Sequence, residues 1–455
     1  MLKAGFMEVD YTPEEGWMPG QIERHYAKGV RTPIMAHAAV IESGANMAVL
    51  ISLDILFVSQ NFTDGLRRRI SERIGVPGEY IFIAATHTHT GCGTDVDCWG
   101  TPADAEMAAR VQEAAFDAAV IAWENRVVCR MGVGTGFDAR FNFCRDWFTT
   151  DGTIKFNPSM KNPEKLVRPY AAVDHTVNVI RFDDMAGNPL CFVVNYANHL
   201  DTNNRRDAFS ADYAGFMRLA LRREYGDVAV LFLNGCCGNV NHYDFATGSH
   251  LTGHCREGVL PSEEIGNGLA ETVEGITPAI LTETKTVHIQ SRIRSYMTSR
   301  RLATEKNKAW AREWQATREA RLAAGEKQDL RKDILAELYL CDESKLAKTV
   351  DLDIQVMQLG PIVLVGLPGE VYSDVGLKIK ALSPFPNTVV VELVGGHKGY
   401  ITPEIIQRSG CYEGTYSNIA FAGPEAPDVL VEGAVQMLKA LYEVDNHTVI
   451  GDFAF

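Results

Sequence analysis

The stretch Ala84-Ala85-Thr86-His87-Thr88-His89-Thr90-Gly91 decides how this chain is interpreted. It follows Tyr80-Ile81-Phe82-Ile83, whose apolar, β-branched and aromatic residues predict a buried strand. Because a strand points alternate side chains to opposite faces, His87 and His89 are expected on one side, near the strand's C-terminal edge. Open α/β sheets place their chemistry at that edge. Two imidazoles there can share a metal, or one can bind it while the other moves protons, although His-x-His also occurs as simple strand decoration.

The segments around this strand predict an α/β fold with a mixed β-sheet core and covering helices. Residues 47–55 form a near-continuous apolar run typical of a buried strand. Residues 61–75 have the helical spacing of an amphipathic helix, and the Ala-rich residues 102–125 predict another helix. Strand, helix and strand in this order are typical of an α/β layer. Residues 1–35, rich in Gly, Pro and charge, are expected to lie over the outside of the domain.

Several later strands also end in a turn that carries a polar side chain. The side chains expected at these strand ends are His87, His199, Asn239, Asn241, Glu370 and Tyr400. Strand ends that converge on one edge of a rigid sheet form a site by geometry. Two imidazole nitrogens with one carboxylate oxygen are a ligand set of catalytic zinc, which leaves a position open for water.

Composition limits the classes of function. The 455 residues are 46% apolar and 22% charged, as in globular proteins, and the net charge of −14 disfavours nucleic acids and anionic membranes. The start of the chain lacks the features of a secretory signal, and no apolar run is long enough to span a bilayer. We therefore expect a cytoplasmic protein without stable membrane insertion, which acts on a small molecule and keeps most of its ten cysteines reduced. The oligomeric state is open.

No internal repeat and no interdomain linker is recognisable, so residues 1–455 are interpreted as a single domain. Residues 299–347 differ in composition, being dominated by Arg, Lys, Glu and Ala. This pattern predicts one or two surface helices, broken near Gly325, as a charged helical insertion outside the catalytic unit.

These motifs resemble the neutral, non-lysosomal ceramidase family in its metal-binding catalytic domain. The family's Thr-His-Thr-His-Ser-Gly is similar to residues 86–91, and its second strand-ending histidine is similar to His199. Its Pro-x-Glu-Phe motif resembles Pro368-Gly369-Glu370-Val371. Its Tyr-x-Thr run, followed twelve residues on by Tyr-Glu-Gly, resembles Tyr400-Ile401-Thr402 and Tyr412-Glu413-Gly414. A family arginine in an Asn-Arg-Ser context falls at Arg140. The segment 299–347 lies outside the resemblance, and we expect no counterpart of the family's C-terminal immunoglobulin-like domain.

The resemblance implies a zinc ion and a set of residues around it. The implied ligands are His87, His199, Glu370 and Tyr400. The residues that would line the site, orient a carbonyl or stabilise its oxyanion are His89, Arg140 and Tyr412.

One position departs from the family pattern. The family's nucleophilic serine lies in Gly-Asn/Asp-Val/Leu-Ser-Pro-Asn, whereas this chain has Asn241 at the serine position of residues 238–243. An amide cannot form an acyl-enzyme, so we expect attack by metal-activated water, with His89 or His242 as proton carrier. The vicinal thiols of Cys236 and Cys237 are rival nucleophiles, but tight apolar turns more often hold inert thiols.

The sequence thus predicts a zinc-dependent hydrolase, similar to the ceramidases, that cleaves an amide or a related acyl bond. A small polar amide, such as an N-acylated sugar or amino compound, fits a cytosolic enzyme at least as well as ceramide. The first alternative is a zinc-dependent hydrolase of lactones or carbohydrates. The second is a non-catalytic ligand-binding relative that kept the metal.

Overall fold

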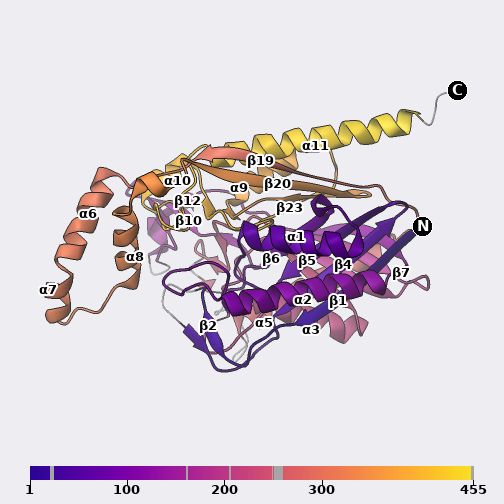
Figure 1. Ribbon diagram of the computed structural model, residues 1–455, viewed down its shortest axis with the longest axis horizontal. Helices are drawn as coiled ribbons and strands as arrows, with labels where there is room; N and C mark the ends of the chain where they lie inside the picture. Colours follow the sequence, from indigo (N-terminus) through magenta and orange to yellow (C-terminus); the bar gives the residue numbers. More distant parts are fainter. Residues whose placement is uncertain (21–24, 160–161, 204–205, 248, 251–259, 452–455) are drawn as a thin grey trace.

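Three mixed β-sheets with paired helices on their outer faces make up the body of the protein, as a computed structural model shows (Figure 1). This arrangement confirms the predicted fold class, a mixed β-sheet core with covering helices. The structure describes residues 1–20, 25–159, 162–203, 206–247, 249–250 and 260–451.

The first sheet has the strand order β6-β5-β4-β1-β7, in which β5 and β6 are parallel and the other neighbours antiparallel. Helix α1 connects the parallel pair, and α2 follows β6 and packs on β1 and β4. The elements are β1 (Leu2–Asp10), β4 (Met35–Ser43), β5 (Asn46–Leu53), α1 (Gln60–Ile74), β6 (Ile81–Ala85), α2 (Ala105–Glu124) and β7 (Val127–Val128).

The second and third sheets have the orders β15-β14-β13-β8 and β19-β20-β21-β23. In each sheet, the two strands that come last in the chain are parallel to each other. One helix connects these two strands, and a second helix follows them. The second unit contains β8 (Arg130–Phe137), β13 (Thr176–Asp183), β14 (Pro189–Tyr196), α3 (Asp212–Tyr225), β15 (Ala229–Asn234) and α5 (Pro261–Ile276). The third contains β19 (Ile289–Ser299), β20 (Thr349–Leu359), β21 (Ile362–Gly366), α9 (Ser373–Leu382), β23 (Thr388–Val391) and α11 (Ala426–Gly451).

The order strand, strand, strand, helix, strand, helix therefore occurs three times along the chain. The sequence-based conclusion that there is no internal repeat misses this repetition. The physical reason is that only the order and pairing of the elements repeat, not the residues. Insertions of different lengths separate the equivalent strands, and different apolar side chains fill the equivalent buried positions.

Short additional elements lie in these insertions and in the loops at the strand ends. They are β2 (Gly16–Met18), β3 (His25–Ala27), β9 (Phe143–Cys144), β10 (Asp146–Thr149), β11 (Ile154–Phe156), β12 (Leu166–Pro169), β16 (Val240–Asn241), β17 (Tyr243–Asp244), β18 (Ser249–His250), β22 (Glu370–Val371), β24 (Tyr400–Ile401) and α10 (Glu404–Ser409).

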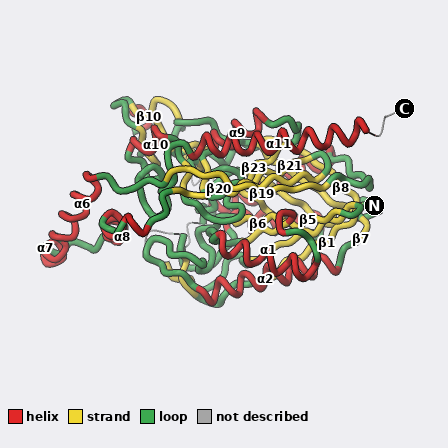
Figure 2. Tube along the Cα trace, turned by 45° about the horizontal axis from the view of Figure 1, so that its top comes forward, coloured by secondary structure: helices red, strands yellow, loops and turns green. Residues whose placement is uncertain are grey.

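The inner faces of the three sheets meet in one hydrophobic core. Leu50 of β5 points into it beside Leu231 of β15 and Leu364 of β21. On the opposite face of β5, Leu53 packs with the α1 and α2 side chains, which is the period-two alternation of a strand buried on both faces. Figure 2 shows α1 and α2 on one side of the strands, and α9 and α11 on the other.

The prediction for residues 1–35 is partly wrong. Residues 2–10 form β1, an internal strand of the first sheet, paired along its whole length with β4. The short alternating run Leu2-Lys3-Ala4 contains the signal, because Leu2 and Ala4 are fully buried. Some of the Gly and charged residues that suggested a surface segment lie within this strand. The others, and all of the Pro residues, follow it.

The charged segment 299–347 contains three helices between β19 and β20, and they project from one end of the body (Figure 1). The helices are α6 (Glu305–Ala316), α7 (Arg318–Ala323) and α8 (Leu330–Tyr339). No helix among the described residues is long and apolar enough to cross a membrane.

Candidate metal centre

Loops that follow the parallel strand pairs of all three sheets meet at one point and are joined by backbone hydrogen bonds. Thr88, after β6, forms a bridge with Leu200, after β14. The Gly238 N–H group donates to the Val371 carbonyl over 2.9 Å. These bonds fix the segments that carry His87, His199 and Glu370 relative to one another, as loops on rigid strands commonly do at functional sites.

His87 and His89 lie together, but not for the reason that the sequence suggested. Strand β6 ends at Ala85, so neither histidine is part of the strand. His87 has φ of +73°, a left-handed conformation that is uncommon for residues other than glycine. This turn brings the two rings to a centroid separation of 4.8 Å. Strained backbone of this kind is typical of functional sites, where the surrounding structure enforces it.

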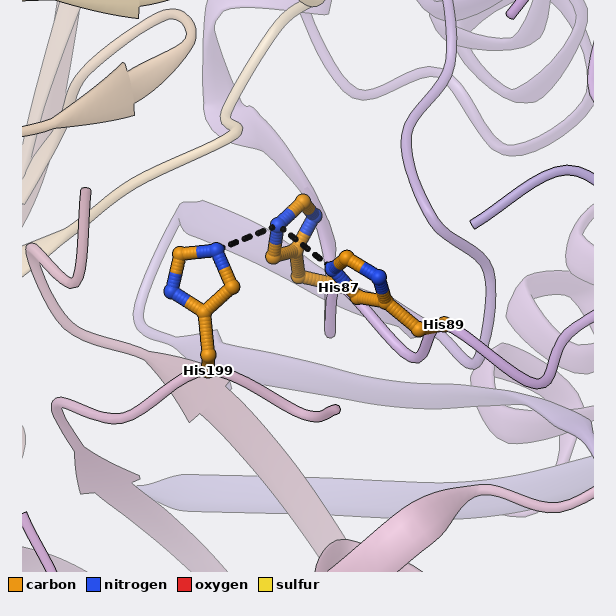
Figure 3. Close-up of side chains that lie close together, drawn as sticks. All are labelled: His87, His89 and His199. Carbon is orange, nitrogen blue, oxygen red and sulfur yellow. Dashed lines mark hydrogen bonds between the residues drawn. The ribbon is translucent and has the colours of Figure 1, made fainter. Parts of the chain in front are cut away.

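Three histidines present their Nε2 atoms to one another (Figure 3). The His87 Nε2 atom lies 3.3 Å from that of His89 and 3.3 Å from that of His199. Each Nδ1 atom donates to a backbone carbonyl. His87 bonds to the carbonyl of Leu56 at 2.9 Å, His89 to that of Gly20 at 2.5 Å, and His199 to that of Cys237 at 2.9 Å. A carbonyl only accepts, so each Nδ1 carries a hydrogen, and each ring that is neutral turns an Nε2 lone pair to the centre.

Glu370 completes this group. Its Oε2 atom lies 3.3 Å from His87 Nε2 and 3.5 Å from His199 Nε2, and it has no hydrogen-bond partner among the described residues although it is buried. Lone pairs that face one another and a buried carboxylate oxygen repel unless a metal ion, or a proton on His87, lies between them. The donor set, imidazole nitrogen with carboxylate oxygen, is the one that zinc and similar divalent metals prefer. The residues therefore fit a metal ion.

The electrostatics of the group agree with this fit. Burial lowers the pKa of His89 to about 3, and burial with the nearby Arg145 lowers the pKa of His199 to about 3. Burial also opposes the charged form of His87, but the Glu370 carboxylate raises its pKa. Burial would raise the pKa of Glu370, whereas the charge of His87 holds it well below its usual range. The centre thus combines a carboxylate anion with imidazoles that are neutral at His89 and His199.

Tyr400 lies beside the group, with its hydroxyl 3.5 Å from His199 Nε2. It belongs to β24, which pairs in parallel with the short strand that carries Glu370. The Arg145 guanidinium donates to the Tyr400 hydroxyl over 3.1 Å. Burial and the nearby Glu370 carboxylate raise the pKa of the Tyr400 hydroxyl well above its usual value, so the group is neutral in the arrangement described.

Arg140, which the resemblance placed in the site, is not there. Its guanidinium bonds to Asp138 and Glu271 beside α5, and half of the side chain is exposed. Arg145, five residues later in the same loop segment, is buried, and its Nη1 atom lies 3.3 Å from His199 Nε2. Asp138, only two residues away, holds Arg140 at the surface, so the structure does not bring Arg140 to the histidines. The buried partner of Arg145 is Glu413, at 2.7 Å.

A cavity of about 220 Å³ opens beside the group of histidines. The predicted residues that line it are His87, His89, His199, Asn241, Glu370, Tyr400 and Tyr412. The Asn241 side chain is held at both ends: its amide donates to Asn157 Oδ1 over 2.8 Å, and its oxygen accepts from the Tyr243 N–H group over 3.0 Å. The Tyr412 hydroxyl accepts from Trp99 Nε1 over 3.1 Å. His242 also lines the cavity.

Two further side chains support the group and were not selected from the sequence. His397 Nε2 lies 3.4 Å from Glu370 Oε1, and its ring stacks on Phe57 at 3.9 Å. Glu392, after β23, accepts hydrogen bonds from the backbone of Cys237 and Val371 at 2.9 and 3.0 Å. Like the predicted site residues, both follow a strand, here β23, whose C-terminal end lies beside the group of histidines.

The vicinal cysteines are poor nucleophiles in this environment. Both are buried, and burial raises the pKa of each thiol well above its usual value. The Cys237 thiol donates to Glu392 over 2.9 Å. This agrees with the prediction of inert thiols.

No protein-family model matches the sequence, and no curated protein matches it by sequence either. The solved structures that are similar to this chain include two ceramidases. The neutral ceramidase from Pseudomonas aeruginosa has a TM-score of 0.72 and 18% identity, with 97% of this chain and 74% of that chain covered. A ceramidase complexed with C2 has a TM-score of 0.70 and 18% identity, with 97% and 75% covered. Likeness at this identity is evidence of the fold alone, and the chain therefore has a neutral ceramidase-like fold.

Proposed function

We propose that this protein is a metal-dependent hydrolase that cleaves a small amide or a related acyl bond, with zinc as its metal. The observation that carries the proposal is the convergence of ligand atoms of His87, His199 and Glu370 beside a cavity. The ceramidase-like fold supports an amide as the bond, because ceramidases are named for the amide lipid that they cleave. We take residues 1–455 as one catalytic domain.

The proposed ligands are His87, His199, Glu370 and Tyr400. When bound, zinc would polarise the substrate carbonyl and activate a water molecule as the nucleophile near neutral pH. Asn241 has neither a hydroxyl nor a thiol, so its amide would instead hold the water or the substrate by hydrogen bonds. Direct attack by water is the mechanism that needs no covalent intermediate on this chain.

Three side chains around the cavity have the positions needed for the remaining steps. Arg145 has an N–H group directed at the centre, so it can donate to the oxyanion that develops on a carbonyl oxygen. The His89 Nε2 atom lies 3.3 Å from that of His87, close enough to the centre to pass a proton to the leaving group. Tyr412 lines the cavity with its hydroxyl held by Trp99 and would orient the substrate.

The proposal is tested with a panel of small amides and esters. We expect hydrolysis that a zinc chelator abolishes and added zinc restores, with no burst of acyl-enzyme and with solvent ¹⁸O entering the acid product in one step. Asn241→Ala is expected to lower kcat/KM by roughly 10- to 100-fold without abolishing turnover, since about 1.5–3 kcal/mol is lost with such a hydrogen bond. An acyl group trapped on Cys236, Cys237 or another side chain would contradict direct attack by water.

A second expectation concerns Glu392, which holds both the Cys237 backbone behind His199 and the Val371 backbone behind Glu370. Glu392→Ala removes these bonds and is expected to weaken zinc affinity by roughly 10- to 100-fold, the usual effect of losing a group that orients ligands. Glu392→Gln is the matched control, because its amide oxygen can keep both backbone bonds. Zinc competition titrations measure the two affinities, and equal affinities for both variants would contradict the orienting role.

A further inference from the structure

Arg331 extends from the charged helical insertion into the lining of the cavity. It lies in the first turn of α8, on the insertion that projects from the body in Figure 1. The sequence suggested that this insertion lies outside the catalytic unit, yet one of its side chains reaches the candidate site. The cavity is therefore formed by loops of the three sheets together with one helix of the insertion.

The position of α8 is fixed by contacts with the body of the protein. The Tyr339 hydroxyl at its C-terminal end donates to the Tyr416 carbonyl over 3.0 Å, and the two rings stack at 5.9 Å. At its N-terminal end Leu330 packs so closely on Gly100 that a Cβ atom there would lie 3.0 Å from the leucine methyl. Arg331 is therefore presented to the cavity by a helix anchored at both ends.

The Arg331 guanidinium lies over two aromatic rings of the cavity. Its central carbon is 4.8 Å from the ring centroid of Tyr412 and 5.7 Å from that of Trp99. The Tyr412 ring in turn contacts the Tyr400 ring at 5.8 Å, which leads to the metal centre. Contact of the guanidinium face with aromatic rings is favourable and leaves the N–H groups at the guanidinium edge able to form bonds in its plane.

The charge of Arg331 has no carboxylate partner within 4 Å in the described part of the chain. The other two arginines of the cavity lining differ in this respect, because Arg145 pairs with Glu413 and Arg206 pairs with Asp201 at 3.4 Å. A half-buried guanidinium that lies over aromatic rings, with no carboxylate within salt-bridge distance among the described residues, can bind a ligand carboxylate or phosphoryl group through two parallel hydrogen bonds.

We propose that Arg331 binds an oxyanion group of the substrate, so that the substrates are small acyl compounds carrying a carboxylate or a phosphoryl group. This inference rests on the proposed function and adds the substrate class to it. The cavity volume agrees, because about 220 Å³ is below the usual range for drug-sized ligands and fits a small molecule. The net charge of −14 repels anions at long range. Physiological salt screens this repulsion over about 8 Å, so the direct contact with Arg331 dominates the binding of an anion in the cavity.

The first test compares paired substrates that differ only in the acidic group. The pairs are N-acetylglycine with N-acetylglycinamide, and N-acetylethanolamine phosphate with N-acetylethanolamine. We expect the wild-type protein to prefer an anionic member, and Arg331→Gln to lower kcat/KM for it by roughly 10- to 100-fold, as expected for a charged hydrogen bond, mainly through KM. The neutral member should change by less than about twofold. The pair that responds identifies carboxylate or phosphoryl recognition.

The matched control is Arg312→Gln, which removes an exposed arginine on α6 of the same insertion, outside the cavity lining. It should leave both pairs unchanged. Arg331→Lys keeps the charge without the planar fork and should recover only part of the preference. Equal effects of Arg331→Gln on anionic and neutral substrates would overturn the inference while the proposed hydrolase function remains.

A binding measurement separates this inference from the proposed function. Succinate and inorganic phosphate are titrated into wild-type protein and Arg331→Gln, with heat or tryptophan fluorescence as the readout, since Trp99 contacts the guanidinium. Anion binding by the wild-type protein that is lost in Arg331→Gln supports anion recognition. If no panel substrate is hydrolysed while this binding is observed, the proposed hydrolase function is contradicted and the anion site is not. Absence of binding to the wild-type protein, together with no preference for anionic substrates, overturns the inference.

Discussion

Replacing both His87 and His199 by alanine is expected to remove almost all of the metal that the purified protein carries. The wild-type chain should carry about one zinc ion, in line with a site of three or four ligands. The two histidines supply facing Nε2 atoms 3.3 Å apart, and without them only Glu370 and Tyr400 of the proposed ligands remain. Elemental analysis of dialysed protein measures the metal, and amide hydrolysis should disappear with it.

His242→Ala provides the matched control. This histidine lines the same cavity but does not belong to the group of ring nitrogens that face one another. The His242→Ala variant should retain the wild-type zinc content. Full zinc retention in the double variant would contradict the proposed metal site. A single variant, His89→Ala, decides between two roles: it keeps the metal if His89 carries protons, and loses it if His89 is a ligand in place of Tyr400.

The first sheet illustrates how much of the fold the sequence predicts. The apolar run 47–55, the amphipathic spacing of 61–75 and the strand before His87 correspond to β5, α1 and β6. Burial imposes these patterns on each element separately, so they can be recognised locally. The packing of three such units around one core leaves no local pattern, because each inner face requires only apolar residues of suitable size.

The candidate site is recognisable from sequence wherever a ligand follows a strand. His199 and Glu370 come after β14 and β21, which are equivalent strands of two repeats, and the structure brings both side chains to His87. Arg145 could not be selected on this basis. It comes from a loop between the short strands β9 and β10, and only tertiary contacts with Glu413 distinguish it from Arg140.

Arg145 and Arg140 form a natural pair for testing which arginine acts in the site. Arg145→Lys is expected to lower kcat/KM for amide hydrolysis by roughly 10²- to 10³-fold, the usual effect of losing one oxyanion donor, because an ammonium group cannot reproduce the guanidinium fork. Arg140→Lys changes a half-exposed side chain beside α5 and should alter kcat/KM by less than about twofold. Steady-state kinetics on one amide substrate compare the two variants.

Lysine is chosen because the pair of Arg145 with Glu413 is buried. Complete removal of one partner from such a pair costs about 3–5 kcal/mol of folding free energy, so Arg145→Ala could lose activity by unfolding. Arg145→Lys keeps a positive charge near Glu413, and thermal unfolding with zinc analysis confirms that the variant is folded and loaded. A folded, zinc-loaded Arg145→Lys with wild-type kinetics would exclude Arg145 as the oxyanion donor. A loss confined to Arg140→Lys would show that the family arginine acts from the surface loop after all.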